Sequence, residues 1–175
     1  RRVSGIDLPP GSGPRHLAFQ PDSGTVFVIN ELVASITTIR FDPHTGQLGP
    51  VLHCVATVPA DFPAHKSTAA ILVHPNGSFL YGSNRKFADH PLADSIVAFD
   101  LQDRGQAPKL IGHATQGLAF ARTMAIDPGA TWLYVLNQKG DSIVQFLVDP
   151  FNGALCATGR ITEITTPVGL VFRST

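Results

Sequence analysis

One sequence pattern occurs three times along the 175-residue chain at nearly constant spacing. Each copy contains an alternating apolar segment, a proline-containing turn and a solid apolar run that ends in asparagine. The turn prolines Pro21, Pro75 and Pro128 lie 54 and 53 residues apart. The asparagines keep the same spacing, at Asn30, Asn84 and Asn137. A repeat of fixed period indicates similar supersecondary units that stack on one another, and this constrains the fold more than any other feature of the sequence.

Each repeat predicts four short strands and no helix. The first strand alternates apolar and polar residues, the second is almost wholly apolar, and the third reads SITTIRFD, SIVAFDL or SIVQFLVD. A looser fourth strand follows a further turn. Four strands in a period of about 50 residues are typical of propeller blades, so we expect an all-β propeller of four-stranded antiparallel blades. A plain β-sandwich is the alternative, but it would not explain the constant register of the repeats.

The repeats predict one partial domain over residues 1–175. Its blades are expected at about residues 14–58, 66–114 and 120–164. Residues 1–7 and 166–173 resemble single flanking strands, each from an incomplete blade. Propellers usually have four to eight blades, so the chain is expected to supply about three blades of a larger propeller.

The balanced charge of the chain excludes a large surface of one charge for binding a partner. Lysine plus arginine equals aspartate plus glutamate at 13 each, and charged residues make up only 15% of the chain. A neutral chain has no general attraction for nucleic acid or an anionic membrane. No apolar run approaches the roughly 20 residues of a membrane helix. We therefore expect no nucleic-acid or membrane partner, and any anionic ligand must be recognised by local groups.

The two cysteines, Cys54 and Cys156, lie within apolar, strand-like runs. Two such residues do not make a disulfide framework, so we expect both to be buried free thiols. Free thiols favour a reducing compartment, which predicts a cytoplasmic protein.

Propeller geometry predicts a functional site at one mouth of the central channel. Successive strands run antiparallel and the first is innermost, so the start of strand one and the end of strand two meet at the same end. The first strands supply Arg15, His16 and Arg122, with Ala69 and Ala70 at the matching positions of the second repeat. The second strands supply Asn30, Glu31, Asn84, Arg85, Asn137 and Gln138.

Three arginines around one carboxylate predict binding of an anion together with proton transfer. Guanidinium groups suit carboxylates and phosphates, and Glu31 could activate water. Structural roles are the alternative: turn or capping asparagines, ion pairs, or arginine ties between blades. Strand alternation would also turn His16 away from the channel. The other histidines lack metal-ligand spacing, so neither a metal nor a cofactor is expected.

At GPRHLAFQP, VINEL and YGSNR the chain resembles the lactonase family of seven-bladed propellers, which includes the propeller-type 6-phosphogluconolactonases and the fungal carboxy-cis,cis-muconate cyclases. The resemblance covers essentially the whole chain and matches the C-terminal half of the family pattern. It implies a metal-independent enzyme that acts on a lactone. The family's site residues fall on Arg15, Glu31 and Arg85, and the arginine that opens the next blade falls on Arg122. Where the family usually has an acid, this chain has Ala70.

The expected function is hydrolysis of a small anionic lactone, with 6-phosphogluconolactone as the substrate. Glu31 would be the general base, assisted by Arg15 and Arg85. The remaining predicted substrate-binding residues are Arg122, His16, Asn30, Asn84 and Asn137. Two alternatives stay open: a carboxy-cis,cis-muconate cycloisomerase that binds a carboxylate substrate with the same arginines, and a non-catalytic propeller that binds a partner. The single tryptophan counts against a WD-repeat scaffold.

Overall fold

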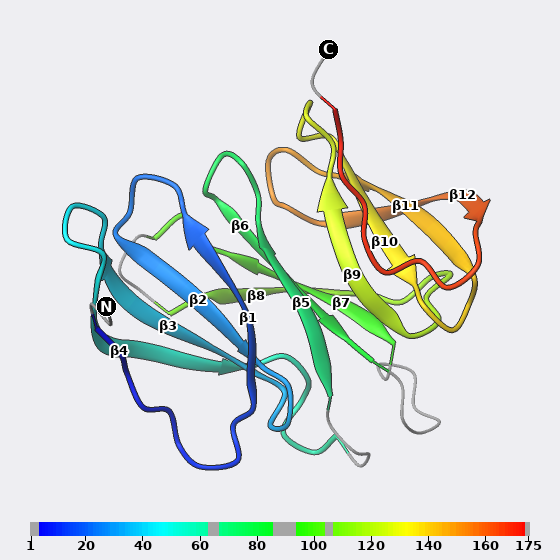
Figure 1. Cartoon of the computed structure of the whole chain (residues 1–175). Coiled ribbons are helices and arrows are strands. Elements are labelled where there is room, and N and C mark those ends of the chain that lie inside the picture. The colour runs from blue at the N-terminus through cyan, green and yellow to red at the C-terminus, as the bar shows by residue number, and fades with distance from the viewer. Residues whose placement is uncertain (1–3, 63–66, 86–93, 104–106, 174–175) are drawn as a thin grey trace.

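The computed structural model describes residues 4–62, 67–85, 94–103 and 107–173. Within these ranges the chain forms twelve strands and no helix (Figure 1). The strands are β1 Pro14–Gln20, β2 Thr25–Asn30, β3 Ser35–Asp42, β4 Gln47–Ala56, β5 Thr68–Val73, β6 Phe79–Asn84, β7 Ser95–Asp100, β8 Lys109–Ala114, β9 Ala121–Ile126, β10 Trp132–Asn137, β11 Ser142–Val148 and β12 Leu155–Glu163. Across the described ranges there is accordingly no helix that could cross a membrane.

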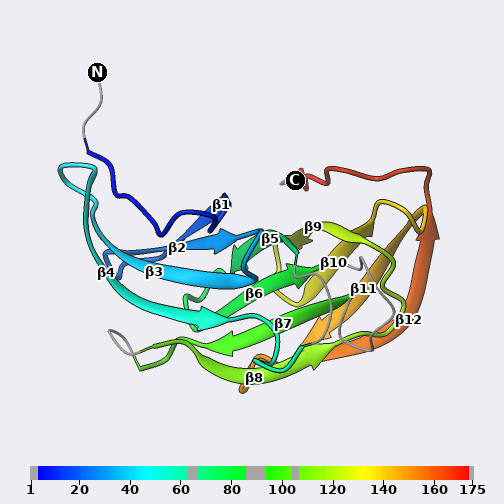
Figure 2. The same cartoon turned by 90° about the horizontal axis from the view of Figure 1, so that it is seen from below.

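The strands form three antiparallel sheets, each with its strands in sequence order. The innermost strands β1, β5 and β9 are neighbours. Figure 2 shows the outermost strands β4, β8 and β12 along the outer side of the molecule. This arrangement is a partial propeller of four-stranded blades, as the repeats predicted. The sheets span residues 14–56, 68–114 and 121–163, and the predicted start of the second blade at residue 66 lies outside the described residues.

The flanking segments differ from the prediction. Neither residues 4–7 nor residues 166–173 form a strand, and residues 1–3 are not among those described. A strand requires a neighbour in a hydrogen-bonded ladder, and no described strand lies in register with either segment. Instead, the Leu48 amide donates to the Ser4 hydroxyl at 2.9 Å, and the Phe172 ring lies 5.4 Å from the Tyr134 ring. Side-chain contacts therefore hold both segments against the blades.

The prediction of buried thiols was wrong. Cys54 and Cys156 are free and exposed. They lie on β4 and β12, the outermost strands of their blades, which have a sheet neighbour on one side only. An apolar run on such a strand is only partly covered, so its composition alone does not imply burial.

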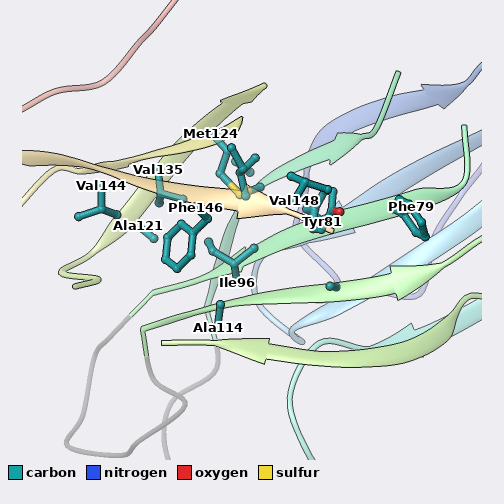
Figure 3. Close-up of a cluster of buried hydrophobic side chains, with 13 residues drawn as sticks. Phe79, Tyr81, Ile96, Ala114, Ala121, Met124, Val135, Val144, Phe146 and Val148 are labelled. Atoms are coloured by element: carbon teal, nitrogen blue, oxygen red, sulfur yellow. The ribbon is translucent and has the colours of Figure 1, made fainter. Parts of the chain in front are cut away.

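Packing of one blade against the next forms the core. At the first interface, Phe27 and Ile29 of blade 1 contact Leu80 and Val97 of blade 2. The second interface, drawn in Figure 3, joins residues of blades 2 and 3. Its members are Ala70, Phe79, Tyr81, Ile96, Ala98, Ala114, Ala121, Met124, Leu133, Val135, Val144, Phe146 and Val148. The solid apolar second strands β2, β6 and β10 lie inside the blades: every residue of β6 is buried, and those of β2 and β10 are buried or partly buried.

A glycine turn fixes the second interface. Gly153 has φ +72°, and a Cβ there would come within 2.4 Å of the Phe79 ring. Its carbonyl accepts a hydrogen bond of 2.9 Å from the buried hydroxyl of Tyr81. Only glycine fits both the left-handed backbone and the close approach, so this turn of blade 3 docks directly onto blade 2.

Truncation of Phe146 tests the blade interface. Because Phe146 is fully buried there, Phe146→Ala should lower the free energy of unfolding by about 3–5 kcal/mol. The matched control is Phe151→Ala, since Phe151 is 86% exposed and should change stability by less than about 0.5 kcal/mol. Urea unfolding of the complete gene product measures both. Equal effects for the two variants would contradict the packing described above.

Candidate active site

A β-bulge recurs at the start of each innermost strand. The ladder between β1 and β2 shifts register around Arg15, and the ladder between β9 and β10 shifts around Arg122. The same shift falls on Ala69 and Ala70 in β5. A bulge turns a side chain out of the regular alternation of its strand. The repeat therefore redirects the same position in every blade.

A second recurring feature is a backbone bond that closes the end of each blade near the axis. The residue after the second strand donates its amide to the carbonyl of the residue just before the first strand. The three pairs are Glu31 to Gly13 at 2.7 Å, Arg85 to Ser67 at 2.8 Å and Gln138 to Phe120 at 3.2 Å. This bond holds the start of strand one beside the end of strand two, as propeller geometry predicted.

Glu31 lies between two guanidinium groups from different blades. Its Oε2 is 3.3 Å from Nε of Arg15, and its Oε1 pairs with Nη2 of Arg85. Its carbonyl also accepts the Thr68 amide at 3.2 Å. The Glu31 side chain is 32% exposed, so the carboxylate is held from two sides and still reaches solvent.

The two arginines are anchored on blade 2. Nη1 of Arg15 donates to the Ala69 carbonyl at 2.7 Å, and Nη2 of Arg85 donates to the Ser67 hydroxyl at 2.8 Å. The Arg85 side chain is only 6% exposed, against 16% for Arg15. Burial lowers the pKa of Arg15, and the charges of Arg85 and Arg122 lower it further, while Glu31 opposes them. Positive charge thus exceeds negative charge in the cluster.

Arg122 lies at the edge of this cluster. Its Nη1 donates to Oε1 of Gln138 at 3.4 Å. It forms no ion pair with Glu31 among the described contacts, yet its charge depresses the pKa of both Arg15 and His16. Its side-chain partner among the described contacts is thus a neutral amide.

His16 lies against Arg15, although strand alternation predicted that it would point away. Nη1 of Arg15 is 3.3 Å from Nδ1 and 3.2 Å from Nε2 of the ring. Both ring nitrogens thus lie within hydrogen-bonding distance of the guanidinium group. The bulge at Arg15 is the reason, because it breaks the two-residue period on which the prediction depended. Burial lowers the pKa of His16, and Arg15 and Arg122 lower it further.

The three asparagines lie inside the blades. Asn30, Asn84 and Asn137 are buried. Each amide nitrogen donates to the hydroxyl of the serine that opens the next strand: Ser35 at 2.9 Å, Ser95 at 2.9 Å and Ser142 at 3.1 Å. The asparagines therefore bind strand ends together, and we do not include them in the proposed substrate-binding set.

Ser67, Phe120 and Lys139 also contact the cluster, although they were not among the residues predicted from the sequence. The Arg85 guanidinium lies 5.2 Å from the centre of the Phe120 ring, and the Lys139 ammonium lies 4.1 Å from it. The repeat could have identified two of them, because Ser67 and Phe120 occupy the positions in blades 2 and 3 that Gly13 occupies in blade 1. Within the described residues no group of acidic, histidine or cysteine side chains could hold a metal.

The three blades define a partial propeller with an arginine-rich cluster where the innermost strands begin, and the comparisons identify its family. Residues 1–172 match the family described as lactonase, 7-bladed beta-propeller. The chain therefore belongs to the lactonase family of seven-bladed β-propellers.

Similar proteins agree with this assignment. The 6-phosphogluconolactonase of Formosa agariphila is 34% identical over 161 residues, which are 89% of this chain and 42% of that protein. The 6-phosphogluconolactonase of Yersinia pestis is 30% identical over 168 residues, 96% of this chain and 48% of that protein. The chain thus spans about half the length of the curated relatives it matches.

Solved structures show the same fold. The periplasmic gluconolactonase of Pseudomonas aeruginosa superimposes with a TM-score of 0.85 at 26% identity, covering 97% of this chain and 45% of that one. A protein from Lactobacillus plantarum gives a TM-score of 0.81 at 32% identity, covering 94% and 45%. Both overlays extend over nearly all of the three blades.

The electrostatics of the cluster predict a low pKa for His16. Burial and the positive charges of Arg15 and Arg122 disfavour its imidazolium form, so its pKa in the folded protein should lie below the usual 6.5. Neutral His16 then stabilises the fold above pH 6.5, and this contribution is lost as the pH falls through the folded-state pKa. NMR titration of the ring measures the value directly.

Removal of the Arg122 charge distinguishes its effect on the His16 pKa from the effect of burial. Arg122→Gln should raise the pKa of His16, because the imidazolium loses a repulsive neighbour. The control Arg160→Gln changes an exposed arginine on the outer strand β12 and should leave the titration of His16 unchanged. An unshifted titration in Arg122→Gln would show that Arg122 does not act on this site.

Proposed function

We propose that this chain carries the active site of a lactone hydrolase, and that its substrate is 6-phosphogluconolactone. The observation that carries the proposal is the Glu31 carboxylate, held between Arg15 and Arg85 at one mouth of the channel and still open to solvent. Family membership and relatives named 6-phosphogluconolactonase support it. Excess positive charge around one carboxylate suits an anionic substrate that must be attacked by water.

The proposed steps follow from the groups present. Glu31 takes a proton from water as the water oxygen forms a bond to the lactone carbonyl carbon. The guanidinium groups stabilise the negative charge that develops on the carbonyl oxygen. The ring C–O bond then breaks, and its oxygen receives the proton from Glu31, so that the hydroxy acid leaves and the carboxylate is restored. Arg122, whose side-chain partner is neutral, binds the phosphate.

We also propose a cytoplasmic location. The support is that both cysteines are exposed free thiols, which persist in a reducing compartment. One structural neighbour is a periplasmic protein, so fractionation of the source cells is the direct test. Recovery of the protein with periplasmic markers would overturn this location without affecting the reaction.

The glutamate role is tested with the chain's only two glutamates. Glu31→Gln keeps the shape of the side chain but cannot accept the proton, so turnover of 6-phosphogluconolactone should fall at least ~10²-fold. The control Glu163→Gln changes an exposed residue of β12 and should retain wild-type turnover. Hydrolysis above the spontaneous rate is measured with the complete gene product, and thermal unfolding checks that each variant is folded.

The outcomes discriminate between functions. Near-normal turnover in Glu31→Gln would exclude this residue as the general base. If the folded wild-type protein hydrolyses no lactone but cyclises a carboxy-cis,cis-muconate, the site belongs to a cycloisomerase. If it does neither, the propeller is a binding protein and the proposal fails.

A further inference from the structure

Phe120 occupies a position that the other two blades fill with small residues. It precedes the bulge of blade 3, where blade 1 has Gly13 and blade 2 has Ser67. Its carbonyl accepts the Gln138 amide at 3.2 Å, as the repeat requires. The backbone role of this position is thus met by glycine or serine elsewhere, so the large aromatic ring is not needed to close the blade.

The backbone of Phe120 is strained. Its φ is +62°, close to the +66° of Gly13. Glycine adopts this left-handed region freely, whereas a bulky side chain does so at a cost. The amide of Phe120 donates to Oδ1 of Asp94 at 2.8 Å, which helps to hold the conformation. Backbone strain concentrates at active sites and ligand-binding sites, so the strain at Phe120 supports a role for its side chain in the cluster.

The Phe120 ring contacts two cations of the site. The Arg85 guanidinium carbon lies 5.2 Å from the ring centre, and the Lys139 ammonium nitrogen lies 4.1 Å from it. Both distances are within the roughly 6 Å of a cation–π contact, which strengthens when the groups are desolvated. Phe120 is 8% exposed and the Arg85 side chain 6%, so the contact to Arg85 is shielded from water.

We infer that Phe120 is a positioning residue for Arg85. Nη2 of Arg85 contacts both Glu31 and Ser67, and these two contacts fix one end of the guanidinium group. The ring of Phe120 supplies a second constraint on the guanidinium group. Phe120 therefore sets the orientation of the arginine that holds Glu31, without itself touching the substrate.

Three substitutions separate the ring from the backbone. Phe120→Tyr keeps an aromatic face, Phe120→Leu keeps apolar bulk without one, and Phe120→Gly relieves the left-handed backbone. If only the backbone mattered, the glycine variant would match wild type, since blade 1 has glycine there. We expect the opposite order: the tyrosine variant behaves like wild type, while the leucine and glycine variants are impaired.

The first readout is independent of catalysis. In the complete gene product with ¹⁵N-labelled arginine, the guanidinium resonances of Arg85 should show slow rotation in wild type and Phe120→Tyr. In Phe120→Leu they should broaden or average, because the ring no longer restrains the group. Thermal unfolding confirms that each variant is folded. Unchanged Arg85 resonances in folded Phe120→Leu would overturn the inference.

The second readout rests on the proposed function. Phe120→Leu should lower kcat/KM for 6-phosphogluconolactone about tenfold, within the range of a desolvated cation–π contact, and Phe120→Tyr should stay within about twofold of wild type. Equal kcat/KM for the leucine and tyrosine variants would also overturn the inference. If the wild-type protein hydrolyses no lactone while the Arg85 resonances still respond to leucine and not to tyrosine, the proposed function fails and the positioning role stands.

Discussion

Each blade is a twisted sheet with two faces, and the structure depends on covering one blade with the next. Ile71 and Val73 on β5 pack onto the core of the first interface, and Met124 and Ile126 on β9 belong to the second. The same stacking brings the starts of β1, β5 and β9 together near the axis. The site follows from this contact, because Arg15 reaches the Ala69 carbonyl and Glu31 reaches Arg85 only across the first blade interface. The stability of the fold and the geometry of the candidate site therefore depend on the same interface, and loss of Glu31 would leave the buried Arg85 charge without its carboxylate partner.

A symmetric backbone supports an asymmetric site. The bulge and the closing backbone bond recur in every blade, but the side chains placed there differ. At the bulge the chain has arginine in blades 1 and 3, and alanine in blade 2. The small side chain of Ala69 leaves its carbonyl accessible to Arg15, which a second arginine would obstruct and repel. After the second strand the chain has Glu31, Arg85 and Gln138 in turn. Divergence at equivalent positions thus produces one ion-pair cluster from three similar units.

The sequence was sufficient to predict the strands and the meeting of Arg15, Glu31 and Arg85, because repeat register and strand direction fix where strand ends lie. It was not sufficient for features that depend on a single residue's backbone. The bulge that brings His16 against Arg15 leaves no mark in the apolar pattern, since the alternation resumes at once. Exposure of Cys54 depends on the position of β4 in its sheet, which local composition does not report. The three asparagines are the opposite case. They recur in every blade at the predicted mouth, and this regular recurrence indicated a structural role rather than a role in binding.

One face of blade 1 is left uncovered and lies beside the candidate site. Leu17 and Phe19 on β1 correspond to the covered residues of β5 and β9, but they are 55% and 50% exposed. With Val28 they line an apolar groove of about 480 Å³ that also includes Arg15 and His16. Any structure that covers this face removes water from around Arg15, the member of the Arg15–Glu31 pair that lines the groove, and charges interact more strongly where water is excluded. The strength of the Arg15–Glu31 contact therefore depends on the cover of blade 1 as well as on the residues that form the pair.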